Sequence, residues 1–268
     1  MDTNPHEHTV RSADGTQIGV TTVGSGPPLV LVHGAWNWAE HWLGVADELA
    51  DAHTCSVMDR RGRANSGDGD DYSFECEIED IAAVLEATGT SASLLGHSSG
   101  AIYALETARR VSVDGLVLYE PPLRWAERGD PNQLVGRIRE LVDENRLDEA
   151  AELFFREEGR LPEEGVAALK KMPDWEAMVA LAPICVREWD AILDARLGVD
   201  RYRGLGTPTL LLAGSENLDH PSMATEALST TLPDVRTVVL DGHAHAAHRT
   251  DPVQVADEVR AFLGATAA

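Results

Sequence analysis

The sequence predicts an α/β fold: a mostly parallel, eight-stranded sheet flanked by helices, with an inserted helical lid. Three observations predict it. Short apolar segments alternate with amphipathic helical ones in the two outer parts of the chain, as in sheets covered on both faces. A charged helical stretch without strand-like segments separates those parts, and one strand-to-helix turn carries a serine between two glycines. The length of 268 residues suits one large domain or a core with an insertion.

The first two strands form a predicted hairpin over residues 9–24, because Asp14-Gly15 separates two alternating stretches and is a two-residue turn signal. The other six strands are short apolar runs, typical of strands buried on both faces. They are expected at residues 28–32, 54–58, 93–96, 115–119, 208–213 and 235–240. Helical spacing predicts the surrounding helices at residues 38–50, 73–88, 101–110, 222–232 and 253–263.

The composition changes between residues 123 and 203, where the chain is charged and helical. Asp130-Pro131 has the pattern of an N-cap followed by proline at the first helical position. Further helices are expected at residues 133–147, 148–156, 163–171 and 183–193. This segment, 123–203, is the predicted cap or lid between a first core part, 1–122, and a second, 204–268. Ligands of open α/β sheets bind at the carboxyl ends of the strands, so the lid is expected there.

The bulk composition limits the classes of partner. Because 45 acidic residues against 22 basic ones give a net charge of −23, nucleic acid and anionic membranes are not expected as partners. A small-molecule substrate and a monomer or homodimer are expected instead. The three cysteines have neither a disulfide framework nor metal-ligand spacing, so no metal site is predicted. The polar first eight residues do not resemble a signal peptide, which favours a cytoplasmic location.

The chemistry is concentrated in Gly96-His97-Ser98-Ser99-Gly100, which follows an apolar strand and opens a helix. Glycines at both ends allow the sharp turn that lifts one serine hydroxyl above a sheet. At a helix N-terminus, free N–H groups can stabilise a developing oxyanion. The stretch therefore predicts Ser98 as a nucleophile; the alternative is a glycine-rich turn with an inert serine.

A serine nucleophile needs a general base, and histidine suits that role because its pKa lies near the working pH. His243, His245 and His248 all follow the last predicted strand, on a loop that returns to the top of the sheet. From position alone each of the three is a candidate. A His-x-His zinc site is disfavoured because no third ligand has a suitable spacing.

The base needs an acid that fixes its tautomer, and two places compete for it. Glu120 stands directly after an apolar strand and before two prolines, which would hold it rigidly. Glu216 and Asp219 belong to the loop after the next strand. Both loops open onto the same edge of the predicted sheet, so the residues alone leave the choice open.

The oxyanion donors are expected from two turns. His33-Gly34-Ala35-Trp36 follows the third strand, and glycine there lets the backbone approach a ligand. The Ala35 N–H is one predicted donor and the Ser99 N–H, just past the nucleophile, is the other. The side chains of Trp36, Trp125 and Trp189 are candidates for lining an apolar substrate pocket, the alternative being packing within core and lid.

These residues resemble the α/β-hydrolase family from about residue 10 to residue 263, in the family's order of serine, acid and histidine. The matching pieces are His33-Gly34, the stretch Asp59-Arg60-Arg61-Gly62-Arg63-Ala64-Asn65-Ser66, the elbow at Ser98, and Gly242-His243-Ala244-His245. Members usually carry G-x-G-H at the last of these, so the resemblance implies His245 as the base, with Ala244 replacing a glycine.

The usual acid of the family, an aspartate after the strand ending at Gly214, corresponds here to Asn217, which cannot carry charge. Some members, including lactonases similar to zearalenone hydrolase, use a glutamate after the preceding strand, and Glu120 in Leu118-Tyr119-Glu120-Pro121 matches that arrangement. The resemblance thus favours Glu120 over Asp219 and Glu216. Serine at the elbow argues against dehalogenase and epoxide hydrolase activity, since those members carry aspartate there.

The resemblance implies a cofactor-free serine hydrolase that cleaves an ester or lactone of a small, fairly apolar compound through an acyl-enzyme. Two alternatives within enzymes are a C–C bond hydrolase and a tailoring enzyme of secondary metabolism on the same triad. An alternative of another class is a ligand-binding receptor that retains the triad, because fold alone does not decide function.

Overall fold

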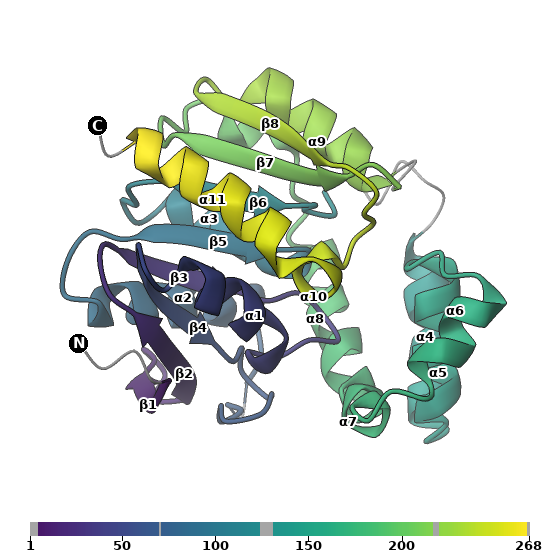
Figure 1. Cartoon of the computed structure of the whole chain (residues 1–268). Coiled ribbons are helices and arrows are strands. Elements are labelled where there is room, and N and C mark those ends of the chain that lie inside the picture. Colours follow the sequence, from purple (N-terminus) through teal and green to yellow (C-terminus); the bar gives the residue numbers. More distant parts are fainter. Residues whose placement is uncertain (1–4, 70, 124–130, 217–219, 267–268) are drawn as a thin grey trace. The chain divides into compact units, whose positions relative to one another are not determined.

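The computed structural model describes residues 5–69, 71–123, 131–216 and 220–266, which divide into two compact units. One unit combines residues 1–124 with 198–268, and the other spans 125–197. Figure 1 shows both along the chain. Residues 125–197 form a compact unit of their own; that the segment 123–203 acts as a lid is a prediction from the sequence. None of the described helices combines the length and the apolar character that crossing a membrane requires.

The first unit contains an eight-stranded sheet in the order β1-β2-β4-β3-β5-β6-β7-β8, which confirms the predicted fold class. The strands β2 and β4 pair antiparallel, as do β1 and β2, and all pairs from β4 to β8 are parallel. The strands are β1 His6–Arg11, β2 Gln17–Gly24, β3 Pro28–Val32, β4 Thr54–Met58, β5 Ser93–His97, β6 Leu116–Tyr119, β7 Thr209–Gly214 and β8 Val235–Leu240.

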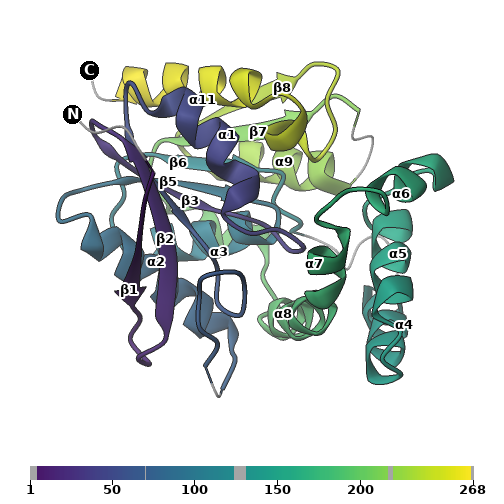
Figure 2. The same cartoon turned by 60° about the horizontal axis from the view of Figure 1, so that its bottom comes forward.

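The helices of this unit cover the sheet on both faces (Figure 2). They are α1 Glu40–Leu49, α2 Phe74–Ala87, α3 Ser99–Ala108, α9 His220–Thr231, α10 Ala247–Thr250 and α11 Pro252–Thr266, with a 3-10 turn, η2 Val199–Tyr202. Helices α1 and α11 lie side by side, as do α2 and α3. Buried side chains of α1 and α11, Trp42 and Val259 among them, pack with strand residues such as Leu31 and Val117 into one hydrophobic cluster.

The second unit consists of α4 Pro131–Asp143, α5 Leu147–Glu157, α6 Glu163–Leu169, α7 Trp175–Ala180 and α8 Ala182–Asp194. Helix α4 packs on α5 and on α8. Aromatic rings also hold these helices together, since the Phe154 and Trp189 ring centroids are 5.0 Å apart. The short helix α7 was absent from the sequence-based prediction, because six residues are too few for a periodic pattern to stand out.

One local prediction was wrong: the first hairpin does not have a two-residue turn. Arg11 pairs with Gln17, so five residues connect the two strands. The Ser12 N–H donates to the Thr16 carbonyl, and the Asp14 carboxylate accepts the Thr16 N–H inside that loop. A wider loop satisfies these backbone groups locally, and Gly15 takes the positive φ of 92° that the loop requires.

The close approach of α3 to β3 depends on Gly100. A Cβ atom at this position would lie 2.4 Å from the His33 carbonyl oxygen and 2.5 Å from that of Val32. Both distances are shorter than real Cβ contacts, and backbone cannot rotate away as a side chain can. The start of α3 is therefore pressed directly against the end of β3.

We expect Gly100→Ala to lower the free energy of unfolding by about 3 kcal/mol, because the added methyl forces two backbone segments apart. Gly264→Ala is the matched control, since Gly264 lies in α11 with open space around it. There the better helix propensity of alanine should leave the stability unchanged or raise it by up to about 1 kcal/mol. Urea unfolding followed by circular dichroism measures both; equal stability of the two variants would contradict the close packing.

Candidate active site

The backbone at Ser98 is strained, and Ser98 is more exposed than its neighbours in the chain. Ser98 lies between β5 and α3 with φ 53° and ψ −127°, a conformation that L residues rarely adopt. Its N–H donates to the Tyr119 carbonyl at 2.9 Å. Ser98 is partly exposed, whereas Gly96, His97, Ser99 and Gly100 are buried. Such a strained turn from a strand into a helix, with one accessible serine, is the backbone geometry expected of a nucleophile elbow.

The turn after β3 approaches Ser98 closely, because a Cβ atom on Gly34 would lie 2.7 Å from the Ser98 Cβ. The His33 ring fixes this turn from below. Its Nε2 accepts the Arg60 N–H at 3.0 Å, so its Nδ1 carries the hydrogen and donates to the Gly34 carbonyl at 2.8 Å. Since N–H and C=O point in opposite directions across a trans peptide, the Ala35 N–H points away from the His33 ring.

Burial keeps this histidine neutral. Desolvation, together with the nearby charges of Arg63 and Arg60, lowers the pKa of His33 well below its ordinary value. The neutral ring can therefore hold one donor and one acceptor nitrogen at once, as the two hydrogen bonds require. The Ala35 carbonyl is held separately by the Asn37 side chain, which donates to it at 2.9 Å.

Arg60 joins the turn after β3 to the start of α3. Its guanidinium is fully buried and binds both oxygens of Glu77, at 2.9 and 2.7 Å. The remaining nitrogen, Nη1, donates to the Ser99 Oγ at 3.2 Å. The first N–H groups of a helix have no partner within that helix, so the Ser99 N–H at the start of α3 is free of intrahelical bonds. The predicted donor at Ser99 thus belongs to a residue whose side chain bonds Arg60. The other, at Ala35, follows Gly34, whose carbonyl is held by the His33 ring that Arg60 bonds.

Sequence reasoning missed this role of Arg60. The signal was present in two places, because Arg60 and Arg61 follow a buried strand and Glu77 and Asp80 lie three residues apart on an amphipathic helix. The Arg61 guanidinium binds both oxygens of Asp80, at 2.7 and 2.8 Å. Pairing two buried arginines with two buried acids is what burial of charge requires.

The structure brings Glu120 to His245. The Glu120 Oε2 and the His245 Nδ1 are 2.5 Å apart, although the residues are 125 positions apart in the chain. The other carboxylate oxygen, Oε1, accepts the Gly214 N–H at 2.7 Å. Glu120 is fully buried, and the His245 side chain is 40% exposed. An acceptor on the Nδ1 side leaves the Nε2 lone pair of the imidazole available for a proton.

Gly214, at the end of β7, supports this pair in two ways. Its N–H donates to Glu120, and its lack of a side chain admits the histidine loop. A Cβ atom there would lie 2.3 Å from the His243 carbonyl oxygen and 2.7 Å from that of Ala244. The family's usual acid would follow β7; in this chain the end of β7 instead supplies the Gly214 N–H as a donor to Glu120.

The other candidates for base and acid are placed differently. His243 lies 3.4 Å from Asp251, and His248 is buried with its ring stacked on Trp42 at 4.5 Å. Glu216 is exposed, and its backbone N–H donates to the His243 carbonyl. Asp219 lies outside the described residues, as does Asn217. Of the candidate carboxylates that the structure describes, it is Glu120 that bonds the His245 ring.

The three tryptophans that were candidates for the substrate pocket lie in different parts of the chain. Trp36 follows Ala35 with a positive φ of 57° and is buried in the first unit. Trp189 is buried in the second unit, where its ring packs on Phe154. Trp125 lies outside the described residues. Their contact with a substrate stays a prediction.

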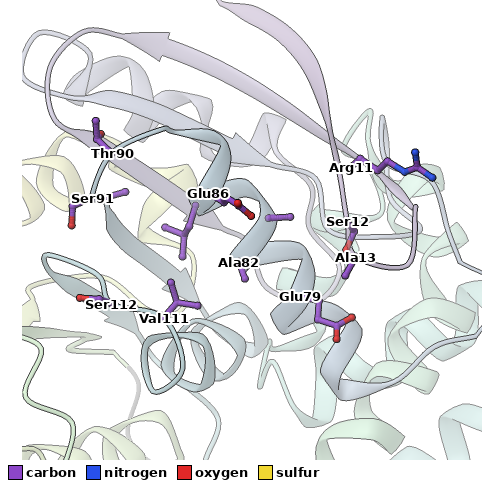
Figure 3. A pocket seen from close by; sticks show the side chains of 13 residues that line it. Arg11, Ser12, Ala13, Glu79, Ala82, Glu86, Thr90, Ser91, Val111 and Ser112 are labelled. Carbon is purple, nitrogen blue, oxygen red and sulfur yellow. The ribbon is translucent and has the colours of Figure 1, made fainter.

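A hollow of about 600 Å³ lies along α2 (Figure 3). Its described lining does not include Ser98, Glu120 or His245. That lining comes from three places: Arg11 at the end of β1 with the two residues that follow it, five residues of α2 between Glu79 and Glu86, and the loops that precede β5 and β6. Glu120 and His245, by contrast, follow the carboxyl ends of β6 and β8. Open α/β sheets bind ligands at the carboxyl ends of their strands, where the Ser98 cluster lies.

In a comparison with sequence models of protein families, the family described as "Alpha/beta hydrolase family" matches residues 29–258 of the chain. An alpha/beta hydrolase from Sphaerobacter thermophilus DSM 20745, known from its crystal structure, is 32% identical, with a TM-score of 0.86 over 95% of this chain and 99% of that one. The pimeloyl-[acyl-carrier protein] methyl ester esterase of Aeromonas salmonicida (strain A449) is 27% identical over 263 residues, 92% of this chain and 99% of that protein. The chain therefore belongs to the alpha/beta hydrolase family, which confirms the family resemblance and an enzyme of the hydrolase class.

We expect the free energy of unfolding to fall steeply as the pH drops from 6.5 towards 5. Burial lowers the pKa of His33, His97 and His248 well below their ordinary value of 6.5. Below pH 6.5 the unfolded chain takes up these three protons and the folded chain does not, so acidification favours unfolding. Each group contributes a slope of about 1.4 kcal/mol per pH unit.

His248→Gln is the variant that tests this slope, because it removes one titrating ring outside the Glu120–His245 pair. Its unfolding free energy should depend on pH less steeply than the wild type's by about 1.4 kcal/mol per pH unit. Urea unfolding at pH 5.0, 5.5, 6.0 and 7.0 measures both slopes. Identical slopes would mean that His248 titrates normally in the folded protein.

Proposed function

We propose that this chain is a serine hydrolase that cleaves an ester or lactone of a small, fairly apolar compound, using its own side chains without a cofactor. The observation that carries the proposal is the hydrogen-bonded pair of the buried Glu120 and the partly exposed His245, built at the same edge of the sheet as the strained, partly exposed Ser98. Such a combination of serine, imidazole and buried carboxylate is the arrangement that activates a hydroxyl for acyl transfer.

In this proposal Ser98 Oγ attacks the substrate carbonyl and His245 Nε2 accepts its proton. Glu120 holds the Nδ1–H of the imidazole, fixes the tautomer and stabilises the imidazolium that forms. His245 then protonates the leaving alcohol oxygen, and an acyl-enzyme remains on Ser98. A water molecule, deprotonated by His245, attacks the acyl carbon. The bond to Ser98 Oγ then breaks, His245 returns the proton to that oxygen, and the acid leaves.

The negative charge on the tetrahedral intermediate is assigned to the N–H groups of Ala35 and Ser99. Support comes from the hydrogen bonds that hold the two turns before any substrate arrives: His33 on the Gly34 carbonyl and Arg60 on the Ser99 hydroxyl. Donors fixed in advance need no reorganisation when charge develops, and removing one such donor costs about 10²–10³ in rate in comparable enzymes.

The ester class is supported by the relative from Aeromonas salmonicida, which is named as a methyl ester esterase and covers nearly the whole chain. The net charge of −23 disfavours a strongly anionic substrate, because the chain's own field repels it. The predicted lid, residues 123–203, would then set which ester or lactone is accepted.

We expect a phosphonofluoridate probe to label Ser98, with the modified peptide located by mass spectrometry. Ser98→Ala should abolish labelling and lower the hydrolysis of short p-nitrophenyl esters by about 10⁴-fold or more. Glu120→Gln should lower it by about 10³- to 10⁴-fold, because the imidazole loses the partner that fixes its tautomer. A panel of small lactones assayed beside the esters decides between the two substrate classes.

Glu216→Gln and Asp219→Asn are the matched controls, since each neutralises a carboxylate of the rival loop. Both should stay within about twofold of the wild type, as substitutions away from a site usually do. Loss of activity in Asp219→Asn with full activity in Glu120→Gln would move the acid to that loop. A folded wild type that is not labelled would overturn the serine hydrolase, and tight ligand binding without turnover would then identify a receptor. Labelling without ester or lactone turnover would point to C–C bond cleavage or a tailoring reaction.

A further inference from the structure

The loop that carries His245 is exposed and has little regular structure of its own. Ala244 and Ala246 on either side of His245 are exposed, and the loop has neither strand nor helix until α10 begins at Ala247. An imidazole on such a loop can take many orientations unless the backbone beneath it is fixed. Catalysis by a positioned base depends on that orientation, since small displacements cost large factors in rate.

Two buried side chains hold the backbone of this loop on both sides of His245. The Tyr119 hydroxyl donates to the Ala244 carbonyl at 2.5 Å and accepts the Ala247 N–H at 3.2 Å. The His97 ring donates from Nε2 to the His245 carbonyl at 3.0 Å. The backbone groups of three loop residues are thus bonded to two side chains of the sheet.

Both donors keep their protons through the neutral pH range. A carbonyl only accepts hydrogen bonds, so the His97 Nε2 must carry the hydrogen. Burial, with His245 and His248 nearby, lowers the pKa of His97 well below its ordinary value, which keeps the ring in this neutral form. Burial and the Glu120 charge raise the pKa of Tyr119, which keeps its hydroxyl protonated.

The two side chains are a cross-strand pair. His97 and Tyr119 are register partners in the parallel strands β5 and β6, and their ring centroids are 5.0 Å apart. The next residue after His97 is Ser98, and the next after Tyr119 is Glu120. One pair of neighbours therefore holds the histidine loop, and the following residue on each strand is the nucleophile or the acid.

We propose that His97 and Tyr119 are positioning residues that fix the His245 imidazole between Ser98 and Glu120. The inference rests on the proposed function, because it assigns the two side chains a part in the reaction of that site. They touch the backbone of the histidine loop and act through it. Any shift of β5 or β6 that moved Ser98 or Glu120 would move their partner pair and the loop with it, so the three groups stay in register.

Tyr119→Phe tests the proposal, because it removes the hydroxyl and both of its hydrogen bonds while keeping the ring. We expect kcat on p-nitrophenyl esters to fall by about 10- to 100-fold, with KM changed by less than about twofold, since the substrate contacts remain and the base is misaligned. The matched control is Tyr202→Phe, which removes a hydroxyl that donates to the buried Glu106 at 2.8 Å in the same unit. That variant should retain the wild-type kcat.

His97 supplies a second, independent pair of variants. His97→Gln keeps an amide donor near the position of Nε2 and should retain most of the wild-type kcat, whereas His97→Leu lacks any donor and should lose about 10-fold or more. Circular dichroism and urea unfolding accompany every variant. Losses of kcat that follow stability alone, equal in Tyr119→Phe and Tyr202→Phe, would overturn the proposal and leave two packing residues.

The proton on His245 Nδ1 gives a readout that does not need turnover. In the wild type its hydrogen bond to the buried Glu120 should give a far-downfield proton resonance in NMR spectra. We expect this resonance to broaden or disappear in Tyr119→Phe and His97→Leu and to persist in Tyr202→Phe. Its persistence in all variants would overturn the positioning role. A wild type that shows the resonance but neither labelling nor ester cleavage would overturn the proposed function. The resonance in the variants would then still test whether Tyr119 and His97 position the loop.

Discussion

A buried carboxylate is the interaction on which the candidate site depends. Glu120 is fully buried, and a charge in that position is tolerated only when hydrogen bonds replace its water. Its two oxygens receive the Gly214 N–H and the His245 ring, so the ends of β6 and β7 and the loop after β8 are held at one point. Removing either donor would weaken the compensation of this charge. A side chain at position 214 would push the histidine loop, and with it the His245 ring, away from Glu120.

Close backbone packing provides the second constraint. Gly100 lets α3 start against the carbonyl groups at the end of β3, and Gly34 lies against the Cβ of Ser98. Arg60 then bonds Ser99 on one side and the His33 ring on the other. As a result, the turn after β3 and the start of α3 belong to one network of hydrogen bonds. The strained backbone of Ser98 persists because the packed groups around it hold it in place.

Three histidines around the site, His33, His97 and His248, are buried, whereas His245 is partly exposed. His33 carries its hydrogen on Nδ1 and His97 carries it on Nε2, and in each case a single backbone group fixes the choice. Burial disfavours a charge on these rings and on His248. His245, by contrast, is 40% exposed and is paired with the Glu120 carboxylate.

The sequence by itself determined the strands and most helices, because the period of apolar residues is a local property of the chain. It also determined the elbow around Ser98 and a short set of candidate bases and acids. Only the tertiary structure decided that Glu120 meets His245, since a contact across 125 positions depends on where β6 and β8 lie in the sheet. The same holds for the bonds of Arg60 to the His33 ring and to Ser99, and for those of Tyr119 and His97 to the histidine loop. Apolar periodicity records which residues are buried, whereas the partner of a buried polar group is set by distances that only the folded chain defines.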